Sequence, residues 1–268
     1  MITRRRFGVI TGSSLASFAL GGACRRLLSI QQADGGRLTA RRRAGIETSV
    51  KGQSALGLDE VRDAILRLPA ELPAAPLPLF VLLHGAGGSA RGVLERMGSA
   101  PEEAGVAVLA PNSRSSTWDA VRNTFGPDVT FLNRALERVF EKVAVDPARI
   151  AIGGFSDGAT YGLSLGLING DLFSHVIAFS PGFVIDGTPH GTPRIFISHG
   201  KTDPILPIDR CGRRIASELR KRGYDVTFRE FEGGHEIPAE VARAGMQWLS
   251  LKKQSSTHES SIRSFVCS

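Results

Sequence analysis

Continuous apolar runs alternate with amphipathic stretches over most of the chain after residue 78. The run Leu79-Phe80-Val81-Leu82-Leu83 has no polar position, which is typical of a strand covered on both faces of a parallel sheet. Further strands are predicted from similar runs at 106–110, 150–153, 176–179, 194–198 and 226–231. The helical spacing of apolar residues predicts helices at 92–104, 129–143, 157–169, 209–222 and 236–251.

This alternation predicts an α/β fold with a mainly parallel central sheet and helices on both faces. Residues 61–68, which precede a proline-rich stretch, fit either a short strand or a helix. In folds of this kind functional residues gather at the carboxyl ends of the strands. The loops that follow the predicted strands are therefore where the chemistry is expected.

The length of 268 residues suits one large domain, and 42% hydrophobic with 22% charged residues is an ordinary globular composition. We expect the α/β domain to cover residues 53–251. Residues 25–52 are rich in Arg, Gln, Gly and Thr with little periodicity, and we expect a linker or an edge strand there. The polar residues 252–268 are expected to form a disordered tail.

The first 24 residues have the pattern of a bacterial export signal. Thr3-Arg4-Arg5-Arg6-Phe7 precedes an uncharged stretch that ends at Ala23, and paired arginines before Phe resemble the twin-arginine class. The stretch is too short and too rich in Gly and Ser for a membrane span. The sequence therefore predicts an exported protein, periplasmic or extracellular. Cys24 follows Gly-Gly-Ala as in a lipoprotein box, so removal of this cysteine and a lipid tether on it both stay open.

The net charge of +7 is concentrated at the start of the chain. Residues 1–43 contain nine arginines and one acidic residue, Asp34, so the rest of the chain is close to neutral. A near-neutral domain argues against nucleic acid as a partner. The three cysteines form no C-x-x-C pair, and no histidine cluster has metal-ligand spacing, so no metal and no organic cofactor is expected.

The segment Gly154-Phe155-Ser156-Asp157-Gly158 places a serine between glycines where a strand is predicted to turn into a helix. Glycines permit a very tight turn, which exposes the serine hydroxyl at the end of the strand. The pattern is a weak signal alone, because a glycine turn with a serine can simply be a turn. The pattern indicates Ser156 as a candidate nucleophile. A serine nucleophile needs a base, and the base needs an acid that orients it, so both should follow later in the chain.

An acid and a base follow two later strands in the order of an α/β-hydrolase. Asp203 lies in His199-Gly200-Lys201-Thr202-Asp203-Pro204, after the strand at 194–198. His235 lies in Glu232-Gly233-Gly234-His235-Glu236, after the strand at 226–231. We expect Asp203 to orient His235, and His235 to accept the proton of Ser156.

The other histidines and acids fit structural roles better. His84 and His199 each precede a glycine at a strand end, and we expect them to brace loops by hydrogen bonding. The remaining candidates lie out of order, in the tail or near the start of a helix: His175, His190, His258 and Asp209.

A second glycine-rich loop, His84-Gly85-Ala86-Gly87-Gly88-Ser89, follows the strand at 79–83. Loops of this H-G-x-G-G type supply backbone N–H groups to a developing oxyanion. The expected donors are the N–H groups of Ala86 and Asp157. A phosphate-binding loop is the rival interpretation, but this loop lacks the Lys-Ser/Thr pair of a P-loop and the spacing of a dinucleotide fingerprint.

Together these motifs resemble the α/β-hydrolases of the phospholipase/carboxylesterase group, which includes acyl-protein thioesterases and polyhydroxybutyrate-depolymerase-like esterases. The resemblance covers residues 78–249 and rests on L-L-H-G-A-G-G-S, G-G-F-S-D-G-A, S-H-G-K-T-D-P-I-L-P and G-G-H-E-I. It implies an α/β-hydrolase fold in which Ser156, Asp203 and His235 are catalytic. Asp157 and Ala159 depart from the pattern of intracellular thioesterases, which carry Gln and Gly there.

The resemblance implies a serine hydrolase that cleaves small-molecule or lipid-like carboxylic esters through an acyl-enzyme. A polyester depolymerase or a feruloyl-type esterase is the alternative with the same chemistry, and an inactive hydrolase-fold binding protein is the alternative without it. Trp118, in the loop after the strand at 106–110, is expected either to line the substrate pocket or to anchor packing. The sequence does not determine the oligomeric state.

Overall fold

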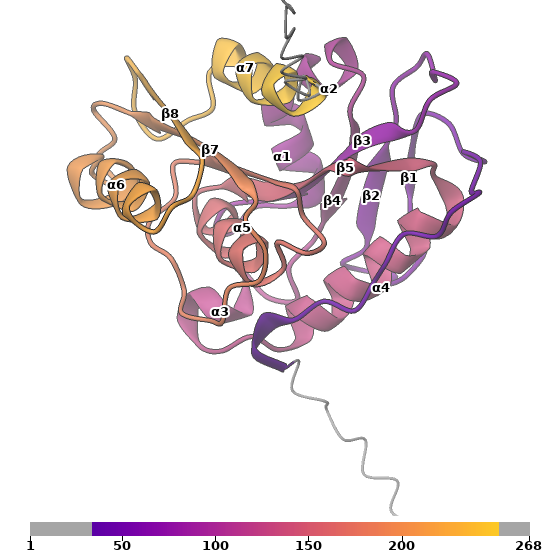
Figure 1. Ribbon diagram of the computed structural model, residues 1–268, viewed down its shortest axis with the longest axis horizontal. Coiled ribbons are helices and arrows are strands. Elements are labelled where there is room, and N and C mark those ends of the chain that lie inside the picture. Colours follow the sequence, from indigo (N-terminus) through magenta and orange to yellow (C-terminus); the bar gives the residue numbers. More distant parts are fainter. Residues whose placement is uncertain (1–33, 252–268) are drawn as a thin grey trace, which may run out of the picture. The chain divides into compact units, whose positions relative to one another are not determined.

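The computed structural model describes residues 34–251, all of which belong to one compact unit (Figure 1). The predicted export signal with Cys24, and the predicted tail with His258 and Cys267, lie outside the described residues. No helix within residues 34–251 combines the length and the apolar character needed to cross a membrane.

The strands of residues 34–251 form one eight-stranded sheet in the order β1-β2-β4-β3-β5-β6-β7-β8. β2 pairs antiparallel with β1 and with β4, and the other neighbouring pairs are parallel. The sheet is therefore mainly parallel, as the sequence predicts. The strands are β1 (Gln53–Ala55), β2 (Ala64–Arg67), β3 (Leu77–Leu83), β4 (Ala107–Pro111), β5 (Val145–Phe155), β6 (His175–Phe179), β7 (Arg194–Gly200) and β8 (Val226–Phe231).

β3 and β5 lie at the centre of the sheet because their sequences allow burial on both faces. All seven residues of β3 and the last six of β5 are buried. In the register, Val81 of β3 pairs with Leu109 of β4 on one side and with Ile152 of β5 on the other. The ends of β3 and β5 are therefore neighbours, and so are the loop after β3 and the turn after β5.

Helices cover both faces of the sheet (Figure 1). Each face has its own apolar core, because successive strand side chains point to opposite faces. Phe80 and Leu82 share one core with α1 and α7, whereas Leu79 and Val81 share the other with α4 and α5. One face carries α1 (Ala90–Met97), α2 (Ala100–Glu103) and α7 (Ala239–Ser250), and the other α3 (Asp119–Arg122), α4 (Pro127–Lys142), α5 (Asp157–Ile168) and α6 (Arg214–Lys221).

Some predicted helices are divided in the structure. The helix expected over 92–104 is α1 and α2, separated at Gly98, whose φ of 54° favours glycine. The helix expected over 209–222 begins as a π-helical turn, Asp209–Arg213, and continues as α6. The pattern does not predict β1 or α3, because three exposed residues and a single helical turn carry no periodicity.

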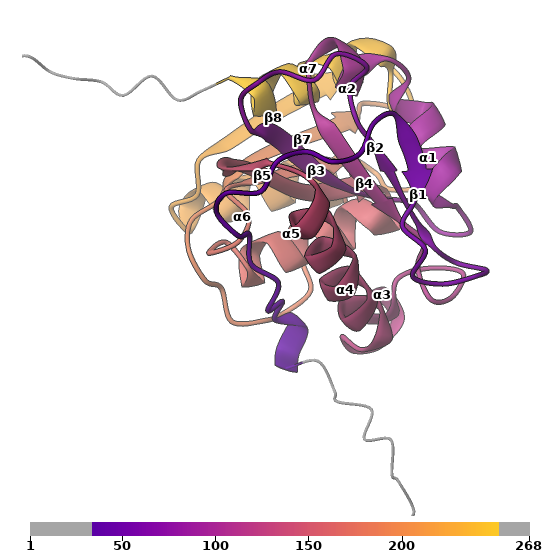
Figure 2. The ribbon, with the colours of Figure 1, turned by 90° about the vertical axis from the view of Figure 1, so that its right-hand side faces the viewer.

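The segment before β1 differs from the linker or edge strand expected over 25–52. Its described part has no strand, and the side chains of Leu38 and Ala40 are buried. The backbone N–H of Leu38 donates to Asn169 at the end of α5, and that of Ala40 donates to Asn133 of α4. Figure 2 shows the segment, in indigo, running along the side of the domain that carries these helices. The packed domain therefore begins before residue 53.

Candidate active site

The turn from β5 into α5 holds Ser156 in a strained conformation. Its φ of 57° is left-handed, which is costly for a residue with a side chain. A Cβ added to Gly154 would lie 2.1 Å from the Leu83 carbonyl oxygen, and one added to Gly158 would lie 2.2 Å from the same atom. Only glycine at both positions lets the turn come this close to β3. Ser156 is thereby fixed at the carboxyl end of β5.

Ser156, His235 and Asp203 form a chain of hydrogen bonds. Ser156 Oγ lies 2.9 Å from His235 Nε2, and His235 Nδ1 lies 2.7 Å from Asp203 Oδ2. Because Nδ1–H donates to the carboxylate, Nε2 is the acceptor for the serine hydroxyl. The three residues follow β5, β8 and β7, whose carboxyl ends share one edge of the sheet. The structure thus brings together the residues that the sequence predicts as nucleophile, base and acid.

Asp203 is buried, and both of its carboxylate oxygens accept hydrogen bonds. Oδ1 accepts from the N–H groups of Ile205 at 2.9 Å and Leu206 at 2.8 Å, while Oδ2 accepts from His235. Burial acts to raise the pKa of Asp203, but these hydrogen bonds outweigh it and leave the pKa below its ordinary value. The site therefore holds a buried negative charge against the His235 ring.

His199 supports the loop that carries Asp203. The ring is fully buried, and its Nε2 donates to the Leu206 carbonyl oxygen at 2.6 Å and lies 3.3 Å from Asp203 Oδ2. Burial lowers the pKa of His199, so the ring is neutral at neutral pH. A Cβ on Gly212 would lie 2.7 Å from His199 Nδ1, so glycine makes room for the ring. His199 has the bracing role that the sequence predicts.

The loop after β3 is held by hydrogen bonds of His84 and of its own backbone. His84 Nδ1 donates to the Gly85 carbonyl oxygen at 2.7 Å, and His84 Nε2 accepts from the Ser113 N–H at 3.1 Å. Burial lowers the pKa of His84, which favours this neutral form. The Gly87 N–H donates to the Ser116 carbonyl oxygen at 2.6 Å. His84 therefore braces the loop, as the sequence predicts.

Two backbone N–H groups near Ser156 are available as donors. The Ala86 N–H has no acceptor within residues 34–251. Asp157 is the first residue of α5, where an N–H lacks an intrahelical acceptor. The loop touches the turn, because a Cβ on Gly85 would lie 3.3 Å from Ser156 Cβ. The Asp157 side chain is engaged elsewhere and accepts a hydrogen bond from Thr117 Oγ1 at 2.6 Å.

Trp118 anchors packing and does not line an open pocket. Its side chain is 0% exposed, and it stacks on Tyr161 with the ring centroids 5.4 Å apart. Its Nε1–H donates to the His84 carbonyl oxygen at 2.8 Å. Of the two expected roles, the structure contradicts pocket lining, because a fully buried ring offers no surface to a substrate. Trp118 instead holds the beginning of the loop after β3.

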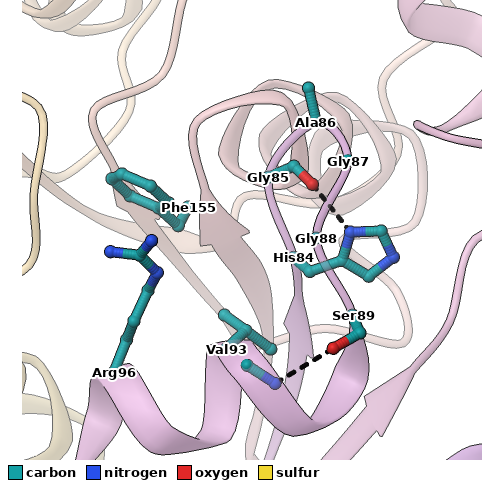
Figure 3. Close-up of a pocket in the computed structure, with 10 residues that line it drawn as sticks. His84, Gly85, Ala86, Gly87, Gly88, Ser89, Val93, Arg96 and Phe155 are labelled. Atoms are coloured by element: carbon teal, nitrogen blue, oxygen red, sulfur yellow. Dashed lines mark hydrogen bonds between the residues drawn. The ribbon is translucent and has the colours of Figure 1, made fainter.

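A pocket of about 210 Å³ lies beside the Ser156 turn (Figure 3). It is lined by the glycine-rich loop after β3, by Phe155, and by Val93 and Arg96 of α1. Sequence reasoning missed both Phe155 and Arg96. Phe155 is the variable position that precedes the serine in G-F-S-D-G, which could have marked it. Arg96 is one polar position of an amphipathic helix, and no sequence signal distinguishes it.

The remaining candidate residues lie away from Ser156. His175 is the first residue of β6 and so lies at the amino end of the parallel strands, whereas Ser156 lies at their carboxyl end; His190 is exposed in the loop before β7. Asp209 begins the π-helical turn and forms an ion pair with Arg213 at 2.8 Å. Across residues 34–251, no group of three or more His, Cys, Asp or Glu side chains is placed to hold a metal ion.

Comparisons with known proteins identify relatives of this chain. Feruloyl esterase C of Emericella nidulans is 28% identical over 157 residues, which cover 55% of this chain and 57% of that protein. Acyl-protein thioesterase 1 of Gibberella zeae is 32% identical over 106 residues, which cover 35% of this chain and 45% of that protein. The chain thus spans about half the length of the curated relatives that it matches.

A fluorophosphonate-binding serine hydrolase of Staphylococcus aureus has a similar solved structure, with a TM-score of 0.61 and 15% identity over 75% of this chain and 99% of that chain. At this identity the likeness shows the fold alone, an α/β-hydrolase sheet with its covering helices. The family model for phospholipases and carboxylesterases matches residues 111–252, just over half of the chain. The chain therefore belongs to the phospholipase/carboxylesterase family of α/β-hydrolases.

Proposed function

We propose that this protein is a serine hydrolase that cleaves carboxylic esters through an acyl-enzyme. The observation that carries the proposal is the chain of hydrogen bonds from Ser156 through His235 to Asp203. A serine hydroxyl is a poor nucleophile at neutral pH, and an imidazole oriented by a carboxylate is a base that activates it. The family membership supports the same chemistry.

In the first half of the reaction, Ser156 Oγ attacks the ester carbonyl carbon while its proton passes to His235 Nε2. The carbonyl oxygen becomes an oxyanion, which accepts hydrogen bonds from the N–H groups of Ala86 and Asp157. The bond to the leaving alcohol oxygen then breaks, and His235 gives its proton to that oxygen. The result is a free alcohol and an acyl group bonded to Ser156.

In the second half, a water molecule attacks the acyl carbon and passes a proton to His235 Nε2. The second tetrahedral intermediate releases the carboxylic acid, and Ser156 Oγ takes the proton back. Asp203 stays ionised in both halves, holds the ring through Nδ1–H and stabilises the imidazolium that forms. Its buried position and its lowered pKa support this role.

The surface around the site favours an ester with an apolar part. Phe183 and Ile205 are 41% and 66% exposed and lie in the loops after β6 and β7. Ile205 N–H donates to Asp203, and the Gly182 N–H donates to Thr160, one helical turn beyond Ser156. The two loops that carry these apolar side chains are therefore tied to Asp203 and to α5 beside Ser156, and exposed apolar side chains there would bind apolar groups. We propose a small-molecule or lipid-like ester as substrate.

A feruloyl-type esterase is the second candidate. The observation in its favour is the similarity to feruloyl esterase C over a little more than half of both chains. The exposed ring of Phe183, in the loop after β6, suits an aromatic acyl group. A polyester depolymerase would use the same catalytic residues and would differ in the substrate that Phe183 and Ile205 contact.

Ester hydrolysis by the purified chain and by Ser156→Ala tests the proposed function. Short-chain p-nitrophenyl esters and methyl ferulate serve as substrates, and Ser54→Ala in the exposed strand β1 is the matched control. We expect Ser156→Ala to lower kcat by at least about 10³-fold with an unchanged unfolding midpoint, and Ser54→Ala to behave as the parent. Turnover retained by Ser156→Ala would contradict the proposal. A folded parent that cleaves no ester would favour a binding protein.

We also propose that the chain is exported, because Arg4-Arg5-Arg6-Phe7 and the uncharged stretch that follows have the pattern of an export signal. Mass spectrometry of the mature N-terminus from a bacterial host tests this proposal. A chain that begins at or after residue 24 is expected, and an uncut chain in the cytoplasm would contradict export. The mass of a lipid on Cys24 would add a membrane tether.

A further inference from the structure

A cationic side chain borders the pocket beside the proposed nucleophile. Arg96 comes from α1, and its guanidinium carbon lies 5.2 Å from the centroid of the Phe155 ring. Figure 3 shows Arg96 and Phe155 on one side of this pocket, with the glycine-rich loop after β3 on the other. The ring attracts the guanidinium, because a cation is drawn to the face of an aromatic ring.

The charge of Arg96 has no partner in the described part of the chain. The side chain is exposed and forms neither a hydrogen bond nor an ion pair within residues 34–251. Among the described residues, no Asp or Glu lines the pocket. By contrast, Arg149 and Arg213 elsewhere on the surface are ion-paired at 2.7 and 2.8 Å. The pocket therefore offers an uncompensated positive charge.

The pocket that Arg96 borders adjoins the turn that carries Ser156. Phe155, which contacts Arg96, directly precedes Ser156, and its ring centroid lies 4.7 Å from that of His235. The opposite wall also reaches the nucleophile, because a Cβ on Gly85 would lie 3.3 Å from Ser156 Cβ. A substituent that extends into this pocket from an ester bound at Ser156 would therefore meet the charge of Arg96.

We propose that Arg96 is a specificity-determining residue that binds a carboxylate carried by the ester substrate. The inference rests on the proposed esterase function and names a substrate class for it. A guanidinium fits a carboxylate through two parallel hydrogen bonds, and the contact with Phe155 favours conformers of Arg96 that stay beside the pocket. The carboxylate is on either the acyl or the alcohol part, while Phe183 and Ile205 bind the apolar remainder.

Two matched ester pairs separate these arrangements. In the first pair, monophenyl adipate carries a carboxylate on the acyl side, and methyl phenyl adipate carries a neutral methyl ester in its place. In the second pair, 3-acetoxybenzoate carries the carboxylate on the alcohol side, and its methyl ester is neutral there. The quantity measured is the ratio of kcat/KM for the charged ester to kcat/KM for the neutral one. Comparing the ratio between variants removes the intrinsic difference in reactivity between the two esters.

We expect Arg96→Gln to lower this ratio about tenfold in at least one pair, which corresponds to about 1.4 kcal/mol. Arg96→Lys keeps the charge and should retain part of the preference. Arg91→Gln is the matched control, because Arg91 is exposed on the same helix but does not line the pocket. Added salt should lower the ratio in the parent and leave it unchanged in Arg96→Gln.

Arg96 would instead be a support for Phe155 if Arg96→Gln slowed the charged and the neutral ester equally. An unchanged ratio in both pairs, or the same loss in Arg91→Gln, would also overturn the inference while leaving the esterase function standing. Absence of turnover with all four esters would overturn the esterase function, and this inference with it.

Discussion

Trp118 donates its Nε1–H to the carbonyl oxygen of His84 at 2.8 Å, which ties two loops together next to Ser156. His84 begins the loop that carries Ala86, and its ring bonds to Gly85 and accepts from the Ser113 N–H. The position of the proposed oxyanion donor at Ala86 thus depends on a tryptophan that is fully buried and touches no substrate.

Replacing Trp118 by Phe removes this hydrogen bond and keeps most of the buried ring. A buried carbonyl left without a donor costs about 1–3 kcal/mol, and we expect the free energy of unfolding in urea to fall by at least that amount, because the smaller ring also leaves buried space unfilled. We also expect kcat to fall more than KM changes, because the oxyanion donors act in the transition state. Phe125→Leu, in the same core, should lower stability without this loss of kcat.

Gly158→Ala tests the close approach of α5 to β3. The added methyl would overlap the Leu83 carbonyl oxygen at 2.2 Å, and we expect a loss of about 1–3 kcal/mol of stability together with most of the activity. The matched control is Gly92→Ala in α1, where the methyl would meet only Ser89 Oγ at 3.4 Å. That change should raise stability by about 0.5–1 kcal/mol. Equal stability of both variants in urea would contradict this account.

His175 makes the stability of the domain dependent on pH. Burial, and then the positive charges of Arg194 and Arg149, lower its pKa from 6.5 to about 4. Between these values the unfolded chain binds a proton that the folded chain does not. The free energy of unfolding therefore falls as the pH drops from about 6.5 to about 4, by up to about 3 kcal/mol from this residue.

His175→Gln should remove this dependence. Urea unfolding of the parent and the variant at several pH values between 4 and 7 measures the difference in stability. We expect the parent to lose stability relative to His175→Gln as the pH falls, and the exposed His190→Gln to follow the parent. A variant whose stability keeps the parent's slope would show that another group is responsible.

The central sheet could be predicted from the sequence because strands buried on both faces leave a local signature. The run at 79–83 lies within β3, and the predicted strand at 226–231 is β8. The order of Ser156, Asp203 and His235 along the chain predicted that these residues meet, because parallel strands bring their carboxyl ends to one edge of the sheet. The glycines beside Ser156 predicted a tight turn, but only the structure shows that the turn needs them because it lies against the Leu83 carbonyl of β3.

Features that depend on tertiary contacts left no such signature. The segment before β1 is held by Asn133 and Asn169, more than ninety residues further along the chain. The two expected roles of Trp118 could be separated only by its burial. Arg96 has the sequence context of any solvated helical arginine, and its place in the pocket comes from the packing of α1 beside Phe155.

Labelling with a fluorophosphonate, followed by peptide mapping, is the most direct test of the proposed nucleophile. We predict one adduct, on Ser156, that is lost in Ser156→Ala and forms more slowly in Asp203→Asn, because the base is then poorly oriented. Ser180, the other serine with a left-handed φ within residues 34–251, is fully buried and should stay unmodified. No adduct on the folded protein, or an adduct on another serine with Ser156 free, would contradict the account.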